Sequence, residues 1–300
     1  MLHALPESFV RTITGLFEDR GVAWLEQLPT LIAECEARWT LRVGAPFLLS
    51  YNYVAPATCA DGTEIVLKLG VPNAEMRSEI EALRIYNGRG IAQMFYGNGD
   101  EGILLLEQLR PGTMLSELED DEAATAIAAN VMRQLWQPAP AEHQFPTIAK
   151  WARGLDRLRA EFEGGSGPFP AKLVEQAEVL FAELIASMGE PVLLHGDLHH
   201  FNILTAEREP WLAIDPKGIV GEPAYEVGAL LRNPNQEIAT NPKILARRID
   251  QLSAELTIDR ARIIGWGLAQ AVLSSWWDYE DLGYGWEPMI ELAARFDQLQ

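Results

Sequence analysis

Hydrophobic residues in the first forty positions recur every three or four residues, the spacing of one helix face. They form two groups, residues 9–17 and 24–32, so we expect the chain to open with two helices. From Trp39 the pattern changes to β-rich runs broken by glycine, proline and the hairpin signal Asp61-Gly62. Residues 39–70 are therefore predicted to form three antiparallel strands.

The next segments continue this alternation. Residues 73–90 place Met76, Ile80 and Leu83 on one face and end at glycines, which predicts a helix. Residues 92–96 and 102–108 read as two further strands, and Pro111-Gly112 breaks the strand pattern. Helical periodicity then dominates residues 118–188 and returns from residue 225 to the end.

This order of elements predicts an α+β fold in two parts. Residues 1–108 would form an N-terminal domain with two leading helices, a five-stranded antiparallel sheet and one further helix. Residues 109–300 would form a mainly helical C-terminal domain. The chain is 48% apolar, which is enough to build a proper core.

Charge narrows the classes of partner. The chain carries 43 acidic and 24 basic residues, a formal net charge of −19, which opposes binding to nucleic acid or anionic lipid. A field of this sign attracts cations such as amines, guanidines or metal ions, although solubility alone explains it equally well. We expect a small cationic substrate and no nucleic-acid or membrane partner.

Cysteine content and hydropathy indicate the cellular compartment of the protein. Two cysteines in 300 residues are too few for a disulfide framework. The N-terminus shows no export signal, and no run reaches the 18 or so uncharged apolar residues of a spanning helix. These features predict a cytoplasmic protein. A monomer or a dimer is expected.

The stretch "LLHGDLHHFNIL" (193–204) concentrates polar chemistry between two apolar runs. It holds three of the five histidines, His195, His199 and His200, together with Asp197. Imidazole and carboxylate both suit zinc, so a zinc hydrolase is one interpretation. The order of the residues does not match a binuclear zinc motif, and the remaining histidines, His3 and His143, lie in no motif.

A second interpretation uses the apolar runs that follow. "FNILT" and "WLAID", separated by the turn-forming "AEREP", predict a β-hairpin in which Asn202 faces Asp215. An amide oxygen and a carboxylate paired in this way could share divalent cations, and Asp197 lies five residues before Asn202. Phosphoryl transfer requires one acid that orients a hydroxyl and two oxygen ligands that bind magnesium.

"HGDLHHFNIL" followed by "AIDPKG" resembles the catalytic and metal-binding loops of protein-kinase-like phosphotransferases. More closely, the stretch through "GIVGEPAYEVGALL" is similar to the aminoglycoside and hydroxyurea resistance kinases. The resemblance implies a two-lobed kinase fold, ATP and Mg²⁺ as cofactors, Asp197 as catalytic base, and Asn202 and Asp215 as magnesium ligands. In related kinases an aspartate stands where this chain has Glu226, and it ties the catalytic loop backbone.

The N-terminal half then supplies candidates for nucleotide binding. Lys68 is a basic residue inside an apolar β-run, where a core position would leave its charge unpaired. The resemblance favours Glu79 as its partner, with Glu75 and Glu81 as alternatives. The resemblance also places adenine at the backbone of Glu107 and Leu109, and phosphates at the glycine-poor segment that carries Ser50 and Asn52.

The acceptor is expected near the C-terminal helices. The segment "SSWWDYEDLGYGWEP" combines aromatic rings with acids, which suit a polycationic sugar. The candidate substrate residues are Trp277, Asp278, Glu280 and Asp281, although tryptophan on a helix often belongs to the core. The resemblance implies phosphorylation of a hydroxyl on an aminoglycoside such as streptomycin.

Two other functions stay open from the sequence. One is a kinase of hydroxyurea or another small hydroxylated amine. The other is a non-catalytic, kinase-like nucleotide sensor, which would have no need of Asp197.

Overall fold

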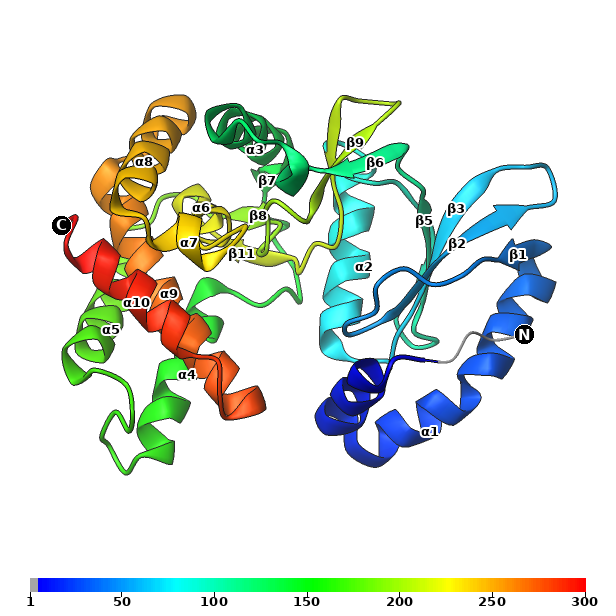
Figure 1. Ribbon diagram of the computed structural model, residues 1–300, viewed down its shortest axis with the longest axis horizontal. Helices are drawn as coiled ribbons and strands as arrows, with labels where there is room; N and C mark the ends of the chain where they lie inside the picture. The colour runs from blue at the N-terminus through cyan, green and yellow to red at the C-terminus, as the bar shows by residue number, and fades with distance from the viewer. Residues whose placement is uncertain (1–4) are drawn as a thin grey trace. The chain divides into compact units, whose positions relative to one another are not determined.

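The computed structural model describes residues 5–300 and divides into two compact units, Met1–Gly112 and Thr113–Gln300 (Figure 1). The division falls slightly beyond residue 108, where the sequence places the boundary. His3, one of the histidines considered above, lies outside the described residues.

Unit 1 is built on an antiparallel sheet with strand order β1-β2-β3-β5-β4. The α+β prediction for this part of the chain is confirmed. Its elements are α1 (Glu7–Trp39), β1 (Leu41–Val43), β2 (Tyr53–Cys59), β3 (Glu64–Leu69), α2 (Ala74–Tyr86), β4 (Met94–Asn98) and β5 (Ile103–Glu107).

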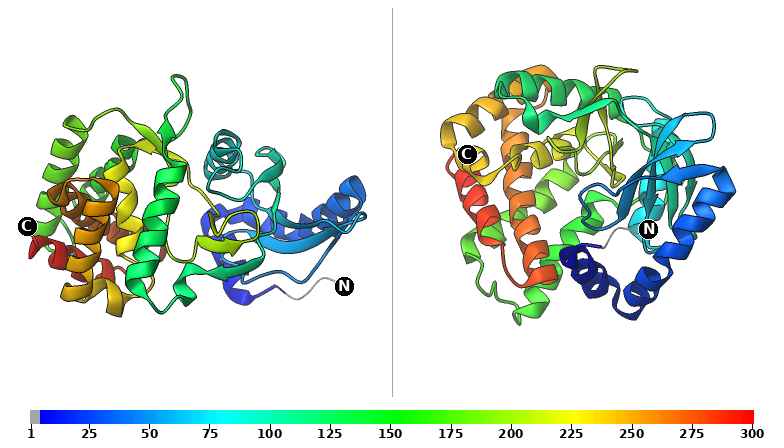
Figure 2. Two further views of the ribbon diagram at one scale, coloured as in Figure 1. Left: turned by 90° about the horizontal axis from the view of Figure 1, so that it is seen from above. Right: turned by 45° about the vertical axis from the view of Figure 1, so that its right-hand side comes forward.

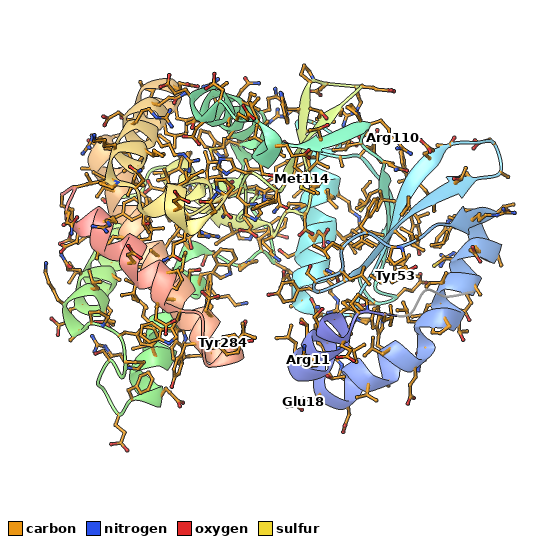
Figure 3. All side chains as sticks on the ribbon, viewed as in Figure 1. Arg11, Glu18, Tyr53, Arg110, Met114 and Tyr284 are labelled. Carbon is orange, nitrogen blue, oxygen red and sulfur yellow. The ribbon has the colours of Figure 1, made fainter. Side chains whose placement is uncertain are left out.

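The long helix α1 is two helical segments joined at a bend. Glu18 has non-helical backbone angles, φ 49° and ψ −130°, and it is labelled in Figure 3. Just beyond the bend, a Cβ at Gly21 would overlap the carbonyl oxygen of Ile13, so only glycine permits this close return of the chain. The two predicted helices therefore correspond to the two segments of α1.

Strand β3 shows how the sheet separates two environments. Ile65, Leu67 and Leu69 alternate along the strand and join the apolar cluster that includes buried residues of α1. Lys68, between Leu67 and Leu69, points to the opposite face and reaches Glu79 of α2. The period of two along this strand thus places one lysine on the face that carries α2.

Unit 2 is mainly helical, with two small antiparallel sheets of strand order β10-β9-β6 and β11-β8-β7. Its helices are η1 (Leu115–Glu117), α3 (Asp121–Leu135), α4 (Ile148–Glu161), α5 (Ala171–Ala186), α6 (Pro223–Leu231), α7 (Gln236–Thr240), α8 (Pro242–Leu256), α9 (Arg260–Leu282) and α10 (Glu287–Asp297). Its strands are β6 (Pro111–Met114), which starts at the end of unit 1, β7 (Gln137–Pro138), β8 (Val192–Leu194), β9 (Ile203–Ala206), β10 (Trp211–Ala213) and β11 (Ile219–Gly221).

Helical periodicity dominates residues 118–188, but these residues are not helical throughout. Between α3 and α4 the chain forms β7 and then an irregular segment up to Thr147. Pro138, Pro140 and Pro146 fall in this stretch, and proline lacks the amide hydrogen that a helix interior needs.

Helix α9 forms the centre of unit 2. It contacts α4, α5, α6, α8 and α10, and Figures 1 and 2 show these helices gathered around it. Residues 263–273 of α9 are buried without a break, so this part is enclosed on all sides. Its last turns, which carry the predicted substrate residues, are more exposed. Within residues 5–300, no helix has the length and apolar character needed to span a membrane.

Candidate active site

Lys68 and Glu79 form a buried ion pair in unit 1. Lys68 Nζ lies 2.6 and 2.8 Å from the two carboxylate oxygens of Glu79, and the side chains are 6% and 7% exposed. Asn73 caps α2 by accepting a hydrogen bond from Met76 N, which fixes where the helix begins and turns Glu79 toward β3.

Of the three glutamates considered for Lys68, Glu79 is the one buried beside it and bonded to it. Glu75 and Glu81 are exposed on α2, and Glu81 pairs with Arg84 at 3.2 Å. The pairing matters because a lysine buried at this site without a counter-charge would be strongly destabilised.

The residues expected at the adenine are partly engaged within unit 1. Glu107 N donates to Gln93 O at 2.7 Å, and the Glu107 carboxylate accepts from Gln93 N at 2.9 Å. The Glu107 amide therefore holds the adjoining chain, and Leu109 is buried. Ser50 is exposed in the connection between β1 and β2, whereas the Asn52 amide packs against Gly70, where a Cβ would overlap it.

In unit 2 a buried glutamate anchors the loop between β8 and β9, residues 195–202. Glu226, at the start of α6, accepts hydrogen bonds from His195 N at 2.7 Å and Gly196 N at 2.9 Å. Burial raises the pKa of Glu226 to about 7, although these backbone donors act in the opposite direction. The extra methylene of glutamate, compared with aspartate, thus still permits the tie to the loop backbone.

His195 connects this loop to the end of β10. Its Nδ1 accepts from Asp197 N at 3.2 Å, so Nε2 carries the proton and donates to Ile214 O at 2.8 Å. Burial lowers the pKa of His195 to about 4, which keeps the ring neutral. His195 therefore positions the residues on either side of it.

Asp197 carries the carboxylate at the centre of the loop. Its Oδ1 accepts from Arg232 Nη2 at 2.9 Å, while its Oδ2 lies 3.6 Å from His199 Nε2. Burial would raise the pKa of Asp197, but the His199 ring and the charges of Arg232 and Lys217 outweigh it and hold this pKa well below its usual range. The group is a carboxylate at any physiological pH.

The predicted pairing of Asn202 with Asp215 is wrong by one residue. β9 and β10 do form the expected antiparallel hairpin, but Ala213 faces Ile203, and Ile214 N donates to Asn202 O at 2.9 Å. A shift of one residue reverses the face of a strand residue. Asp215 instead leaves the ladder in a left-handed conformation, with φ 62°, which redirects its side chain.

The donor atoms at these positions nevertheless suit magnesium. Asn202 Nδ2 donates to Asp197 O at 3.0 Å, which leaves the amide oxygen as a ligand atom, and Asp215 supplies carboxylate oxygens. Residues 5–300 hold no group of three or more His, Cys, Asp and Glu side chains that could bind a metal. The zinc hydrolase interpretation gains no support from this part of the chain.

The predicted substrate residues divide between two sides of α9. Glu280 is held by Arg157 of α4 through two contacts of 2.6 and 2.7 Å. With Arg157 it lines a pocket of about 530 Å³ whose other walls are Ala160, Glu161, Trp276 and Tyr279. Residues two positions apart on a helix point in nearly opposite directions, so Asp278 lies on the side of α9 opposite to Glu280.

Asp278 lies on the side of α9 that looks toward Arg232. Burial raises its pKa, while the charge of Arg232 acts to lower it and that of Asp281 to raise it. Asp278 forms no hydrogen bond or ion pair with the residues described here. Asp281 is exposed in the next turn of the helix. Tyr284, labelled in Figure 3, follows the helix end and is 68% exposed.

Trp277 belongs to an aromatic contact next to the catalytic loop. Its ring meets Trp151 edge to face at 5.5 Å, and the rim of Trp151 would be 3.4 Å from a Cβ at Gly196. Trp276 points elsewhere and is buried among aromatic side chains. Of the two adjacent tryptophans, Trp277 is therefore the one near the loop.

Sequence reasoning missed Arg232, the side chain bonded to Asp197. It follows the buried helix "PAYEVGALL" directly, so a single cation ends a segment whose last five residues, Val227–Leu231, are all apolar or glycine. The same argument that singled out Lys68 applies to this position.

Comparisons with solved structures agree with the fold. Structural neighbours include a choline kinase from Streptococcus pneumoniae, with a TM-score of 0.64, 14% identity and coverage of 91% of this chain and 98% of that one. A thermostable mutant of an aminoglycoside phosphotransferase, solved with ADP and hygromycin B, aligns with a TM-score of 0.63, 14% identity and coverage of 90% and 97%. These neighbours show a protein-kinase-like fold.

Proteins related in sequence identify the family of this chain. The chain is 32% identical to streptomycin 6-kinase of Streptomyces glaucescens over 296 residues, 97% of this chain and 96% of the relative. It is 35% identical to hydroxyurea phosphotransferase of Kitasatospora aureofaciens over 272 residues, 87% and 76% of the two chains. Residues 42–282 match the family described as aminoglycoside/hydroxyurea antibiotic resistance kinase. The chain belongs to that family of phosphotransferases.

Proposed function

We propose that this protein is an ATP- and Mg²⁺-dependent phosphotransferase that transfers the γ-phosphate to a hydroxyl of a cationic aminoglycoside, with streptomycin as the leading candidate. The observation that carries this proposal is the ionised Asp197, held in a loop that Glu226 anchors and followed by the oxygen donors Asn202 and Asp215. The similarity to streptomycin 6-kinase over nearly the whole chain supports the choice of acceptor.

Each residue has a role that follows from its surroundings. Lys68, fixed by Glu79, offers a positioned charge to nucleotide phosphates. Asn202 and Asp215 would hold magnesium, which neutralises charge on the transferred phosphoryl group. Asp197 orients the acceptor hydroxyl and accepts its proton. Since its pKa is low, orientation of the hydroxyl is the larger part of its contribution.

Adenine recognition is assigned to the backbone near Glu107 and Leu109. Because Glu107 N already donates to Gln93 O, the groups proposed for adenine are the Glu107 carbonyl and the Leu109 amide. Ser50 is proposed to contact phosphate, since its side chain is exposed. Asn52 is a weaker candidate because its amide packs against Gly70.

The acceptor is proposed to contact Asp278, Asp281 and the ring of Trp277. A half-buried carboxylate without a hydrogen-bond partner among the described residues gains most from a cation that replaces its lost water. Glu280 is not retained as a substrate ligand, because Arg157 already satisfies it.

Hydroxyurea is the second candidate acceptor, favoured by the 35% identity to a hydroxyurea phosphotransferase. It lacks the cationic groups that Asp278 would bind. A non-catalytic sensor gains no support from the comparisons, whose sequence relatives are kinases and a phosphotransferase by name.

The test is ADP release with Mg·ATP and a panel of streptomycin, other aminoglycosides, hydroxyurea and simple amino alcohols. We expect streptomycin to stimulate ADP formation, and Asp197→Asn to reduce turnover by about 1,000-fold while ATP still binds. Turnover that is unchanged in Asp197→Asn would refute the mechanism. Activity only with hydroxyurea would refute the choice of acceptor.

A further inference from the structure

We propose that Arg232 is a positioning residue for phosphoryl transfer, a role that rests on the proposed function of Asp197. Its Nη2 lies 2.9 Å from Asp197 Oδ1, and the two side chains are 21% and 25% exposed. No other arginine or lysine side chain among residues 5–300 forms an ion pair with this carboxylate. Arg232 thereby fixes the rotamer of Asp197 and occupies one of its two oxygens.

The remaining oxygen of Asp197 is the one left for an acceptor. Oδ2 has His199 Nε2 at 3.6 Å, which is longer than a hydrogen bond. A hydroxyl that approaches Asp197 therefore meets Oδ2, while Oδ1 stays bound to Arg232. By selecting the oxygen, Arg232 would set the direction in which the acceptor hydroxyl faces the phosphoryl group.

The guanidinium is itself held from α9. Arg232 Nη1 lies 3.4 Å from Gln270 Oε1, and the other end of that amide, Nε2, donates to Tyr225 O. A Cβ at Gly228 would overlap the Gln270 amide, so the glycine is what admits this side chain against α6. The contact with α6 thus fixes the orientation of the Gln270 amide, and the amide in turn orients the Arg232 guanidinium.

A second buried arginine braces the segment that carries Arg232. Arg248 of α8, 1% exposed, donates from Nη1 to Asn233 O at 2.6 Å, one residue after Arg232. Its Nη2 contacts His200 Nε2 at 3.3 Å in the catalytic loop, and it also binds Asp121. One rigid side chain therefore ties the end of α6 to the loop that holds Asp197.

Arginine is required for this arrangement because it uses two nitrogens in different directions. Nη2 binds Asp197 and Nη1 points to Gln270, both from one planar group. Lysine offers a single ammonium on a flexible stem and cannot reproduce that fork. The geometry thus predicts that charge alone does not replace Arg232.

The experiment compares Arg232→Ala and Arg232→Lys with wild type and with a matched control, Arg159→Ala. Arg159 has similar exposure, 24%, and forms a two-point pair with Glu178. We expect Arg232→Ala to lower kcat by about 100-fold with little change in KM for ATP. Millimolar guanidinium should restore part of the lost kcat, and Arg232→Lys should recover less than wild-type kcat. Arg159→Ala should leave kcat near wild type and show no response to guanidinium.

The outcomes separate this inference from the proposed function. If wild type shows no acceptor-dependent ADP formation, the proposed function fails and this inference fails with it. If wild type is active and Asp197→Asn is not, a kcat for Arg232→Ala within about threefold of wild type overturns the inference alone. A low kcat that guanidinium does not restore, together with a lowered Tm, also overturns it, because Arg232 would then be structural.

Discussion

Asp197 and Lys68 show how an individual charge is held in place in each of the two units. Each pairs with a buried or half-buried group of opposite sign, Asp197 with Arg232 and Lys68 with Glu79. The lysine pair is more deeply buried, with side chains 6% and 7% exposed, against 25% and 21% for Asp197 and Arg232. Loss of one partner should therefore affect stability most at Lys68.

Substitutions at Lys68 test this argument. Lys68→Met should lower the free energy of unfolding by about 3 kcal/mol, because it removes the ammonium group that pairs with the buried Glu79 carboxylate. The double variant Lys68→Met/Glu79→Met should regain most of that stability but remain inactive. Urea melts and ADP release on both variants provide the measurement, and a double variant as unstable as the single one would contradict the argument.

Asp278 allows a second prediction at the level of the residue. Asp278→Asn should raise KM for a cationic acceptor about 10-fold or more, because the partly buried carboxylate loses its charge. KM for ATP should not change. Glu280→Gln is the matched control on the opposite side of α9, where the expected change is in stability and not in KM. Equal KM effects in the two variants would refute the assignment.

At the level of elements, the hairpin β9–β10 marks what periodicity can and cannot predict. Alternation and turn residues correctly predicted the two strands, as they predicted the sheet of unit 1. The register failed because it depends on how many residues the turn contains and on Asp215 leaving the ladder with φ 62°. Neither property is visible in a hydrophobic pattern.

Contacts between distant elements were the other limit on prediction. Lys68 could be singled out because a charge inside an apolar strand needs an explanation. Arg232 and Arg248 meet the catalytic loop, and Gln270 supports Arg232 from behind. Only the packing of α6, α8 and α9 brings these three side chains together. The candidate site was thus predictable where function lies in one continuous motif, and not where side chains converge from far along the chain.

The packing of α6 against α9 leads to a prediction about glycine. Gly228→Ala should destabilise the protein by about 1–3 kcal/mol and lower kcat, because the new methyl group displaces the Gln270 amide that supports Arg232. Gly15→Ala is the control, since a Cβ at Gly15 meets no atom within 4 Å and alanine favours helix. Stability and kcat are measured together, and an unaltered kcat in Gly228→Ala would contradict the prediction.

For the whole molecule, two buried groups give opposite responses to pH. Glu226 titrates near 7 instead of its ordinary 4.5, so the folded state keeps a proton that the unfolded chain has lost, and stability falls as pH rises from 4.5 to 7. His195 titrates near 4 instead of 6.5, so stability falls as pH drops from 6.5 to 4. The two contributions oppose each other over most of this range.

Glu226→Gln should separate these contributions. The stability of the variant relative to wild type should increase from pH 4.5 to pH 7, by on the order of 3 kcal/mol, because the cost of ionising Glu226 is removed. Urea denaturation of both proteins across this range provides the measurement. A difference that stays constant with pH would show that Glu226 is not protonated in the folded state near neutrality.

The net charge of −19 should act on cationic acceptors before they reach the site. We expect kcat/KM for a polycationic aminoglycoside to fall as NaCl rises from about 0.05 to 0.5 M, since salt screens the attraction. A neutral acceptor such as hydroxyurea should show little change under the same conditions. Equal salt dependence for the two acceptors would exclude long-range attraction as the cause.

The division of α9 into two sides has a consequence for how acceptor range can change. Glu280, Trp276 and Trp277 hold the helix to its neighbours, whereas Asp278 forms no hydrogen bond or ion pair with the described residues. Selection can therefore exchange Asp278, and with it the molecule that is phosphorylated, without loosening the scaffold. Variants with new acceptors should accumulate at this position first.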